Sequence, residues 1–297
     1  MLARFISPAR LSQARKLTSL KMTNPVEISV YPHATGLAAT SAAAHEAEHP
    51  LKLYGSWFCP FVQRAWVVLH EKKIPHQYVE INPYNKSPEF LALNPRGLVP
   101  TLGVPAGTSG KDPKPLYESL VLCEYLDEAY ADEARFGPRL LPGDAYERAR
   151  CRLWADHVAT KVVPAYYKVL MHTPDKAHSI EDARAEFLGS IETLVGQMGG
   201  GGPWFLGDRF SLVDVMLAPW AVRLFLLDHY KPGGSGIDEA RAKDQTTWAR
   251  WQNWFDAITS RQSVRETSSD DEKYIDYYRS YTQGTTPSIV GQATRKG

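Results

Sequence analysis

Residues 56–66 read SWFCPFVQRAW, and they place one cysteine, Cys59, between an aromatic residue and a proline. The segment before them, LKLYG (51–55), alternates apolar and polar residues and ends in glycine, which predicts a short strand. Pro60 suits the first position of a helix, because the N–H that proline lacks would have no partner there. Apolar residues then recur at helical spacing over residues 60–73. The stretch therefore predicts a strand that runs directly into a helix, with a thiol at the junction.

Short strands and helices continue after this junction. We expect a strand at 76–82, a short helix at 87–95, strands at 99–104 and 115–117, and a helix at 118–130. The order of elements is then βαβ, a hairpin and a helix. The segment RFGPRLLPGD (135–144) holds two prolines and two glycines, which indicates a boundary between domains.

Helical patterns replace the strands beyond this boundary, at residues 145–172, 179–198, 211–229 and 239–260. In FSLVDV (210–215), Ser211 can cap a helix and Asp214 can return the bond, a capping box that we interpret as structural. The last helical pattern carries an aromatic stripe, which consists of Trp248, Trp251, Trp254 and Phe255. We interpret this stripe as core rather than as a ligand site.

The composition is that of an ordinary globular protein. Of the 297 residues, 43% are hydrophobic and 23% are charged, with a net charge of +1. A balanced charge points to neither nucleic acid nor an acidic membrane as a partner. No apolar run approaches the roughly 18–20 residues of a membrane-spanning helix. The three cysteines indicate no disulfide framework, and with the nine histidines they show no zinc-binding spacing, so we expect no metal.

Residues 1–26 contain five basic residues and several serines but no acidic residue. This composition is typical of a mitochondrial presequence, and a basic disordered tail is the alternative. We therefore expect the protein in the cytoplasm or in mitochondria. We expect residues 33–48 to be a flexible lead-in to the first domain, and residues 282–297 to be disordered.

The position of Cys59 suggests a reactive thiol. The N-terminus of a helix carries free N–H groups and partial positive charge, which stabilise a thiolate, the nucleophilic form. Arg64 adds a cation one turn further on. We therefore expect the pKa of Cys59 to be lowered, and a buried, inert cysteine is the alternative. Cys123 and Cys151 lie within amphipathic helical patterns, and we interpret both as packing residues.

No second cysteine stands at the spacing of a CxxC dithiol pair. A site with one thiol must take its second thiol from a small molecule, and glutathione is the obvious donor. Three stretches in this order resemble the cysteine-type glutathione transferases: SWFCPFVQRAW, NPRGLVPTL (94–102) and YESLVLCEYLDEAY (117–130). The omega class is closest in this resemblance and the lambda class is next, over roughly residues 50–265.

The resemblance implies an α/β plus all-α architecture. An N-terminal thioredoxin-like βαβ-ββα domain, which binds glutathione, would precede an all-helical C-terminal domain. The implied parts are a basic, flexible extension (1–48), the thioredoxin-like domain (49–132), a linker (133–144), the helical domain (145–265) and a C-terminal tail (266–297).

The resemblance also implies how glutathione would bind. Pro100 would be a cis-proline that opens the third strand, which leaves the backbone of Val99 free to pair with the cysteinyl unit like an added strand. The γ-glutamyl carboxylate would bind at the N-terminus of the following helix with the Ser119 hydroxyl, and Glu118 would face the ammonium group.

Two further residues complete the implied glutathione site, and two features depart from the family pattern. Lys86 would reach the glycyl carboxylate, and Phe61 would pack near the sulfur. The hairpin within residues 103–119 is longer than the family pattern predicts. Ser56 resembles the serine of relatives that activate glutathione with a hydroxyl, but Cys59 is better aligned, so we assign the reaction to the cysteine.

The function that the resemblance implies is a glutathione-dependent thiol transferase or reductase. A Cys59–glutathione mixed disulfide would form during deglutathionylation, dehydroascorbate-type reduction or conjugate reduction. Glutathione conjugation to electrophiles in detoxification or biosynthesis is one alternative, and a non-catalytic binding module is another. We expect a homodimer, and a co-substrate pocket between the domains with Trp154, Tyr166, Tyr167 and Trp220 as its candidate residues.

Overall fold

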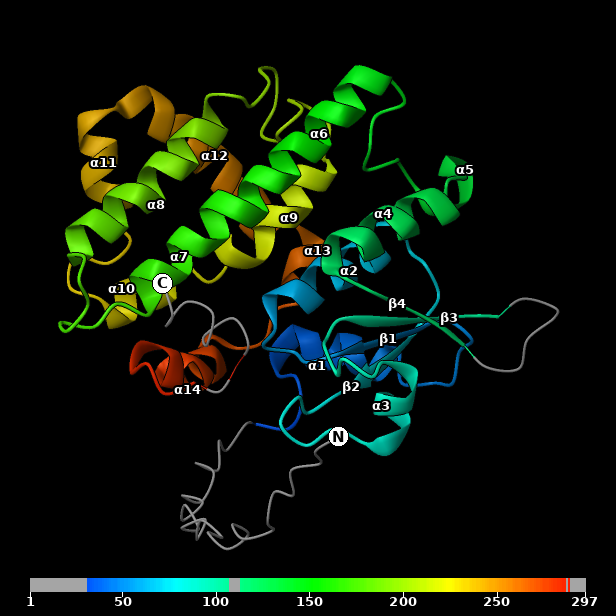
Figure 1. Ribbon diagram of the computed structural model, residues 1–297. Coiled ribbons are helices and arrows are strands. Elements are labelled where there is room, and N and C mark those ends of the chain that lie inside the picture. The colour runs from blue at the N-terminus through cyan, green and yellow to red at the C-terminus, as the bar shows by residue number, and fades with distance from the viewer. Residues whose placement is uncertain (1–30, 107–112, 287, 289–297) are drawn as a thin grey trace, which may run out of the picture. The chain divides into compact units, whose positions relative to one another are not determined.

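The computed structural model describes residues 31–106, 113–286 and 288 (Figure 1). The N-terminal half consists of α1 (Gly36–Ala44), β1 (Lys52–Gly55), α2 (Pro60–Glu71), β2 (Gln77–Glu80), α3 (Pro88–Leu93), β3 (Thr101–Val104), β4 (Lys114–Tyr117) and α4 (Ser119–Ala129). The strands form one sheet in the order β2-β1-β3-β4, in which β1 pairs parallel with β2 and antiparallel with β3. Helices α2 and α4 pack together on one face of the sheet and α3 lies on the other (Figure 1).

The junction between β1 and α2 follows from a glycine and a proline. Gly55 ends β1, and a Cβ at this position would lie 2.4 Å from Cγ1 of Val62, so only glycine lets α2 approach the strand this closely. Pro60 occupies the first turn of α2, with Cys59 as the N-cap residue. The expected βαβ-ββα unit is confirmed.

The second half is helical, and its elements are α5 (Glu133–Phe136), α6 (Ala145–His157), the π-helix η2 (Val158–Val162), α7 (Val163–Leu170), α8 (Ile180–Val195), α9 (Leu212–Ala221), α10 (Phe225–Tyr230), α11 (Ile237–Lys243), α12 (Gln245–Ser260), α13 (Gln262–Arg265) and α14 (Asp271–Thr282). The predicted helix 145–172 is α6, η2 and α7 in direct succession. The predicted helix 239–260 is divided, because Asp244 caps α12 by accepting hydrogen bonds from the backbone of Thr246 and Thr247. Within the described residues, no helix has the length and apolar character needed to cross a membrane.

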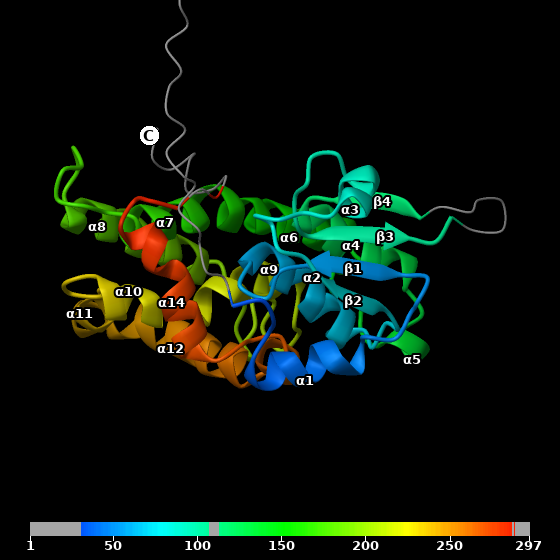
Figure 2. The same ribbon diagram turned by 90° about the horizontal axis from the view of Figure 1, so that it is seen from below.

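The expectation that residues 33–48 are a flexible lead-in was wrong. Residues 33–48 contain α1, whose alanine-rich sequence favours a helix. The backbone N–H of Ala34 donates to Oε1 of Glu80 at 2.8 Å, and Oγ of Ser41 lies 2.8 Å from Nε2 of His70, which tie this segment to β2 and α2. The expected tail 266–297 contains α14, which lies beside α7 and α10 (Figures 1 and 2). The proposed presequence, residues 1–26, lies outside the described residues.

The core of the helical half is centred on α9, whose ten residues are all buried. Oδ2 of Asp214 accepts hydrogen bonds from the backbone N–H and the hydroxyl of Ser211, both at 2.8 Å, so the predicted capping box is confirmed. Oδ1 of Asp214 also accepts from the backbone of Phe205 and from Nε1 of Trp254, each at 2.8 Å. The carboxylate therefore joins α9 to α12, and the tryptophan stripe of α12 is core, as predicted.

We predict that Asp214→Ala lowers the free energy of unfolding by about 3 kcal/mol or more, because it leaves buried donors without an acceptor. Asp244→Ala is the matched control, since it removes an exposed N-cap aspartate and is expected to cost only about 1 kcal/mol. Urea unfolding of both variants measures the difference. Equal losses would show that Asp214 acts as a helix cap alone.

Candidate active site

Cys59 lies where the chain leaves the sheet and enters α2. Its backbone is extended, and its N–H donates to the carbonyl of Ser56 at 3.0 Å. Its own carbonyl accepts the first helical hydrogen bond, from the N–H of Gln63 at 3.1 Å. The side chain is partly exposed, whereas Cys123 and Cys151 are both fully buried. Cys59 is therefore the accessible thiol among the three.

Cys59 faces a cavity of about 210 Å³ between the two halves of the chain. The side chains and backbone that line it come from the start of α2, the loops before α3 and β3, α7 and α14; they are Phe58, Cys59, Pro60, Phe61, Pro83, Tyr84, Lys86, Gly97, Leu98, Val99, Tyr167, Tyr277, Tyr278, Tyr281 and Ser288. The structure thus brings together Cys59, Phe61, Lys86 and Val99, four residues that the sequence analysis assigned to the glutathione site.

Lys86 and Val99 both line the cavity, from the loops before α3 and β3. The Val99–Pro100 bond is cis, as the sequence analysis expected. Gly97 has a φ of +60°, and a Cβ there would lie 3.0 Å from Cδ and Nζ of Lys86. Because glycine occupies this position, the lysine side chain can lie directly against the backbone of the loop. Its ammonium group is thereby held beside the cavity.

Glu118 and Ser119 stand at the N-terminus of α4 and do not line this cavity. Glu118 is exposed and has a φ of +71°, a conformation that costs energy in residues other than glycine and often occurs at binding sites. Its carboxylate pairs with Nη1 of Arg96 at 2.8 Å. Oγ of Ser119 is buried and accepts a hydrogen bond from Nη1 of Arg64 at 3.2 Å.

Of the four candidates for the co-substrate wall, Tyr167 alone lines the cavity. Tyr166 is buried and donates its hydroxyl to the carbonyl of Arg223 at 2.9 Å. Trp220 is buried behind Phe61, with ring centroids 5.1 Å apart. Trp154 packs on helical-domain residues instead, with Phe205 and His157 as its aromatic neighbours.

The sequence analysis missed the tyrosines of α14, which form one wall of the cavity. Tyr277 stacks on Phe58 with ring centroids 3.8 Å apart, and its hydroxyl lies 3.0 Å from the hydroxyl of Tyr84. Tyr278 donates to the carbonyl of Phe58 at 3.2 Å. The tyrosines of residues 274–281 recur at helical spacing, and this signal could have identified the helix.

The expected lowering of the Cys59 pKa was wrong, because burial has the largest effect and raises the pKa of this thiol. The backbone N–H groups of Val62 and Phe61 lower the pKa, as do the charges of Arg223 and Arg64, but they do not outweigh the loss of water. Ser56 is unsuited to activate a thiol, since its buried hydroxyl donates to the carbonyl of Ile81.

Two family models match the chain, one to each half. The glutathione S-transferase N-terminal domain matches residues 58–129, and the glutathione S-transferase C-terminal domain matches residues 177–257. A probable glutathione S-transferase of Oryza sativa, GSTU6, is 35% identical over 231 residues, which are 76% of this chain and 92% of that protein. The chain belongs to the glutathione transferase family.

Omega-class relatives are prominent among the similar proteins. Glutathione S-transferase omega-1 of Sus scrofa is 36% identical over 180 residues, which cover 60% of this chain and 68% of that protein. The crystal structure of glutathione transferase Omega 3C from Trametes versicolor is 39% identical with a TM-score of 0.69, and the match covers 82% of this chain and 99% of that one. The resemblance to omega-class transferases is confirmed, and the protein is an enzyme of this family.

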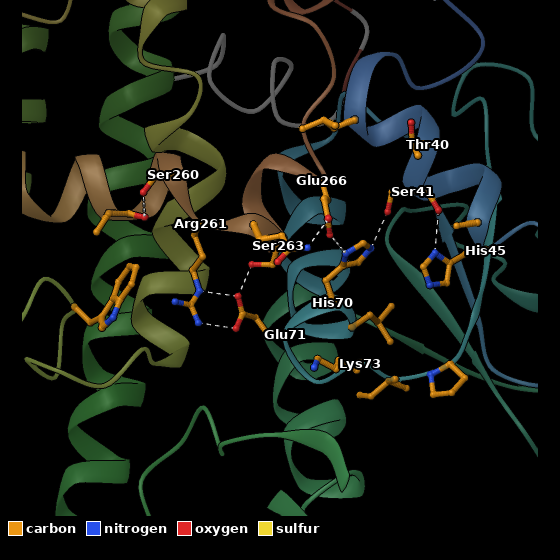
Figure 3. Close-up of a pocket in the computed structure, with 18 residues that line it drawn as sticks. Thr40, Ser41, His45, His70, Glu71, Lys73, Ser260, Arg261, Ser263 and Glu266 are labelled. Carbon is orange, nitrogen blue, oxygen red and sulfur yellow. Dashed lines mark hydrogen bonds and ion pairs between the residues drawn. The ribbon is translucent and has the colours of Figure 1, made fainter. Parts of the chain in front are cut away.

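The transferase has a larger cavity, of about 1040 Å³, at the seam between α1, the end of α2 and the α12–α13 turn (Figure 3). Arg261 holds Glu71 by two hydrogen bonds, of 2.6 and 2.7 Å, across this seam. His70 lies between Ser41 and Glu266 (Figure 3). No cysteine lines this cavity, and its paired charges join segments that are far apart in sequence, so we assign it a structural role.

A histidine behind this seam makes the stability of the transferase depend on pH. His76 is 4% exposed and stacks on His45 with ring centroids 4.2 Å apart. Burial lowers the pKa of His76 to about 3. The unfolded chain takes up this proton near the ordinary pKa of 6.5, whereas the folded protein does not. Stability is therefore complete above that value and is lost as the pH falls below it.

We predict that acidification from about pH 7.5 to about pH 5.5 lowers the stability of the wild type by on the order of 1 kcal/mol more than that of His76→Asn. The exposed residue His229 on α10 offers a control substitution, His229→Asn, which should behave as the wild type. Denaturant unfolding at both pH values measures this difference. Parallel losses in all three proteins would show that His76 does not contribute.

Proposed function

We propose that this glutathione transferase acts as a thiol transferase through a mixed disulfide between Cys59 and glutathione. The observation that carries the proposal is an accessible thiol at the start of α2 in a cavity whose lining contains no other cysteine. A dithiol mechanism within one chain needs a second cysteine nearby. Cys123 and Cys151 are fully buried on other helices, so the second thiol must come from a small molecule.

The reaction takes place in two exchanges. The Cys59 thiolate attacks the glutathione sulfur of a glutathionylated substrate, which forms the Cys59–glutathione disulfide and releases the substrate as a thiolate. The thiolate of a second glutathione then attacks that glutathione's sulfur in the mixed disulfide, which releases oxidised glutathione and regenerates the Cys59 thiolate. The proton that the second glutathione loses passes to the substrate thiolate. One disulfide is consumed and one is formed.

The surroundings of Cys59 suit a bound tripeptide. The backbone of Val99 is the proposed partner of the cysteinyl unit, and Lys86 is the proposed partner of the glycyl carboxylate. The N-terminus of α4, an eleven-residue helix, is the proposed site of the γ-glutamyl carboxylate, with the Ser119 hydroxyl. The strained backbone of Glu118 supports this assignment, because such strain is kept where it serves a site.

The aromatic wall supports an aromatic or otherwise apolar co-substrate. Tyr167, Tyr277 and Tyr281 face the cavity, and their rings offer large apolar surfaces with polar ends. The cavity of about 210 Å³ is smaller than most small-molecule sites, which measure about 300–1,000 Å³. A bulky conjugate can therefore enter only when α14 moves and the contact between the Tyr84 and Tyr277 hydroxyls opens.

Conjugation of glutathione to electrophiles is the second candidate, and the raised pKa of Cys59 favours it. A protonated thiol at this position can donate a weak hydrogen bond to the thiolate of bound glutathione, as a hydroxyl would. In that mechanism Cys59 forms no covalent bond, and serine at this position would preserve activity.

The proposed function predicts that oxidised glutathione adds one glutathione to the wild type and none to Cys59→Ala, because the other thiols are fully buried. Intact-mass spectrometry of both proteins measures the adduct. Cys123→Ser and Cys151→Ser are matched controls and should each retain one adduct. If the wild type stays unmodified, or if Cys59→Ser conjugates glutathione to an aryl halide as fast as the wild type, the thiol-transferase mechanism is wrong.

We also propose that the transferase forms a homodimer. Large apolar side chains are exposed on β4, α4 and α6, where Tyr117 is 39%, Val121 is 51% and Leu153 is 64% exposed. Exposed apolar groups of this kind on neighbouring elements are typical of an interface between protein chains.

The dimer proposal predicts that Leu153→Asp converts the dimer to a monomer, because a charge would be buried without a partner in the interface. Leu37→Asp, at a residue that is 46% exposed on α1, is the control and should remain dimeric. Light scattering after size-exclusion chromatography gives the masses. A wild type that elutes as a monomer, or a Leu153→Asp variant that stays dimeric, would refute the proposed interface.

A further inference from the structure

Two arginines are buried beneath the active site without an acidic partner. Arg64 is 2% exposed and Arg223 is fully buried, and within the described part of the chain neither makes an ion pair. Three of their nitrogens, Nη2 of Arg64 and Nε and Nη2 of Arg223, have no hydrogen-bond partner there. Elsewhere the chain pairs its buried charge, since Nζ of the fully buried Lys72 lies 3.1 Å from Oδ1 of Asp127.

Arg64 projects from α2 toward the helical half. Its Nε donates to the carbonyl of Met216 at 3.0 Å, and its Nη1 donates to the hydroxyl of Ser119 at 3.2 Å. The guanidinium lies 4.5 Å from the ring centroid of Trp220 and 5.3 Å from that of Phe61, which lines the Cys59 cavity. The neutral surroundings hold this cation in place without cancelling its charge.

Arg223 approaches the same region from the turn after α9. Its Nη1 donates to the carbonyl of Pro219 at 2.7 Å and to the side-chain oxygen of Gln63. Its guanidinium lies 4.4 Å from the ring centroid of Tyr274 on α14. Gln63 is adjacent to Arg64 on α2. Its hydrogen bond with Arg223 therefore holds a second cation against the helix that begins at Cys59.

Among the residues that the structure describes, the groups that line the Cys59 cavity or act on its thiol contain no carboxylate. The titratable or charged side chains that line its cavity or act on it electrostatically are Lys86, Tyr78, Tyr84, Tyr167, Tyr277, Tyr278, Tyr281, Arg64 and Arg223. Burial raises the pKa of Tyr167 and Tyr278, which keeps these phenols neutral. The fixed charges near the thiol are therefore all positive.

An unpaired buried cation is costly, and natural structures nearly always pair it. Such a cation is retained where an anion must form in its vicinity. We propose that Arg64 and Arg223 are the counter-charges of the Cys59 thiolate, and that they replace the water that burial removes from this sulfur. Both act through space, as positioning residues for the charge rather than as groups that exchange a proton.

The two cations come from the two halves of the chain. Arg64 belongs to the thioredoxin-like half and Arg223 to the helical half, so the thiolate is supported fully only when both halves are packed together. The inference rests on the thiol chemistry of Cys59 proposed above and identifies what would make that chemistry possible in a cavity with a largely aromatic lining.

The test is the rate at which iodoacetamide alkylates Cys59 as a function of pH, with the modified residue located by peptide mass. Arg64→Met and Arg223→Met should each slow the reaction about tenfold near neutral pH, because a smaller fraction of the protein then carries Cys59 as a thiolate. The pH at which the rate is half-maximal should lie about one unit higher in each methionine variant than in the wild type, because loss of a positive charge raises the pKa of the thiol. A purely structural role would lower the rate without moving this midpoint.

Three comparisons make the result decisive. Arg265→Met removes an exposed arginine of α13 and should leave the profile unchanged. Arg64→Lys and Arg223→Lys keep the charge and should stay within a few-fold of the wild type. Thermal unfolding should show that the methionine variants fold, with some loss of stability because each gives up the hydrogen bonds that its guanidinium donates. If a methionine variant does not fold, the lysine variants carry the test.

The inference would be overturned if the alkylation rates of the methionine variants followed the wild-type rates at every pH. It would also be overturned if the lysine variants reacted tenfold more slowly than the wild type. The alkylation assay contains no glutathione, so its result is independent of the proposed function. If the wild type forms no glutathione adduct but the arginine variants slow alkylation, the proposed function is wrong and the role of the two arginines stands. If the adduct forms but the arginine variants alkylate like the wild type, the proposed function stands and the role of the arginines is wrong.

Discussion

The burial of helix α2 is the constraint on which the rest of this structure depends. Nine of its twelve residues are buried, and it packs on α4, α9 and α13 as well as beside the sheet. The helix delivers Cys59 at its first turn, Arg64 in its middle and Glu71 at its end. Each of these polar groups must therefore find its partners inside the protein rather than in water.

This burial creates the chemical problem of the active site. A thiolate at a helix N-terminus is favoured by the free N–H groups, but desolvation opposes it more strongly here. Local helix geometry alone thus does not produce a low-pKa cysteine. Positive charge from elsewhere in the fold has to compensate, and the unpaired guanidinium groups of Arg64 and Arg223 are the groups positioned to supply it.

The same packing explains why α14 forms one wall of the cavity that Cys59 lines. Helix α14 covers the opening next to Cys59 with tyrosines that contact Phe58 and Tyr84. The aromatic rings reduce the water around the cavity, which strengthens charge interactions there. One helix therefore lies over the cavity and contacts the residue that precedes the thiol.

The local elements could be predicted from the sequence because their signals lie within a few residues of one another. Pro60 and Gly55 place the junction at Cys59, Asp214 and Ser211 mark the start of α9, and the cis-proline at residue 100 follows a recognisable family stretch. The analysis missed α1 and α14 although both carry a local helix signal, the alanines of α1 and the tyrosine spacing of α14. What the local signals could not show is the packing of these helices, which depends on tertiary contacts.

The sequence by itself determined the two-part fold, the cysteine at the junction of strand and helix, and the family, since periodicity, capping and motif order are local properties of the chain. Only the tertiary structure decided which aromatic residues reach the cavity. Of the predicted residues, Tyr167 lines it, the tyrosines of α14 join it, and Trp154, Tyr166 and Trp220 do not. The tertiary structure also decided the sign of the Cys59 pKa shift. Burial and electrostatic interaction depend on distances through space, and residues separated by more than a hundred positions set those distances here.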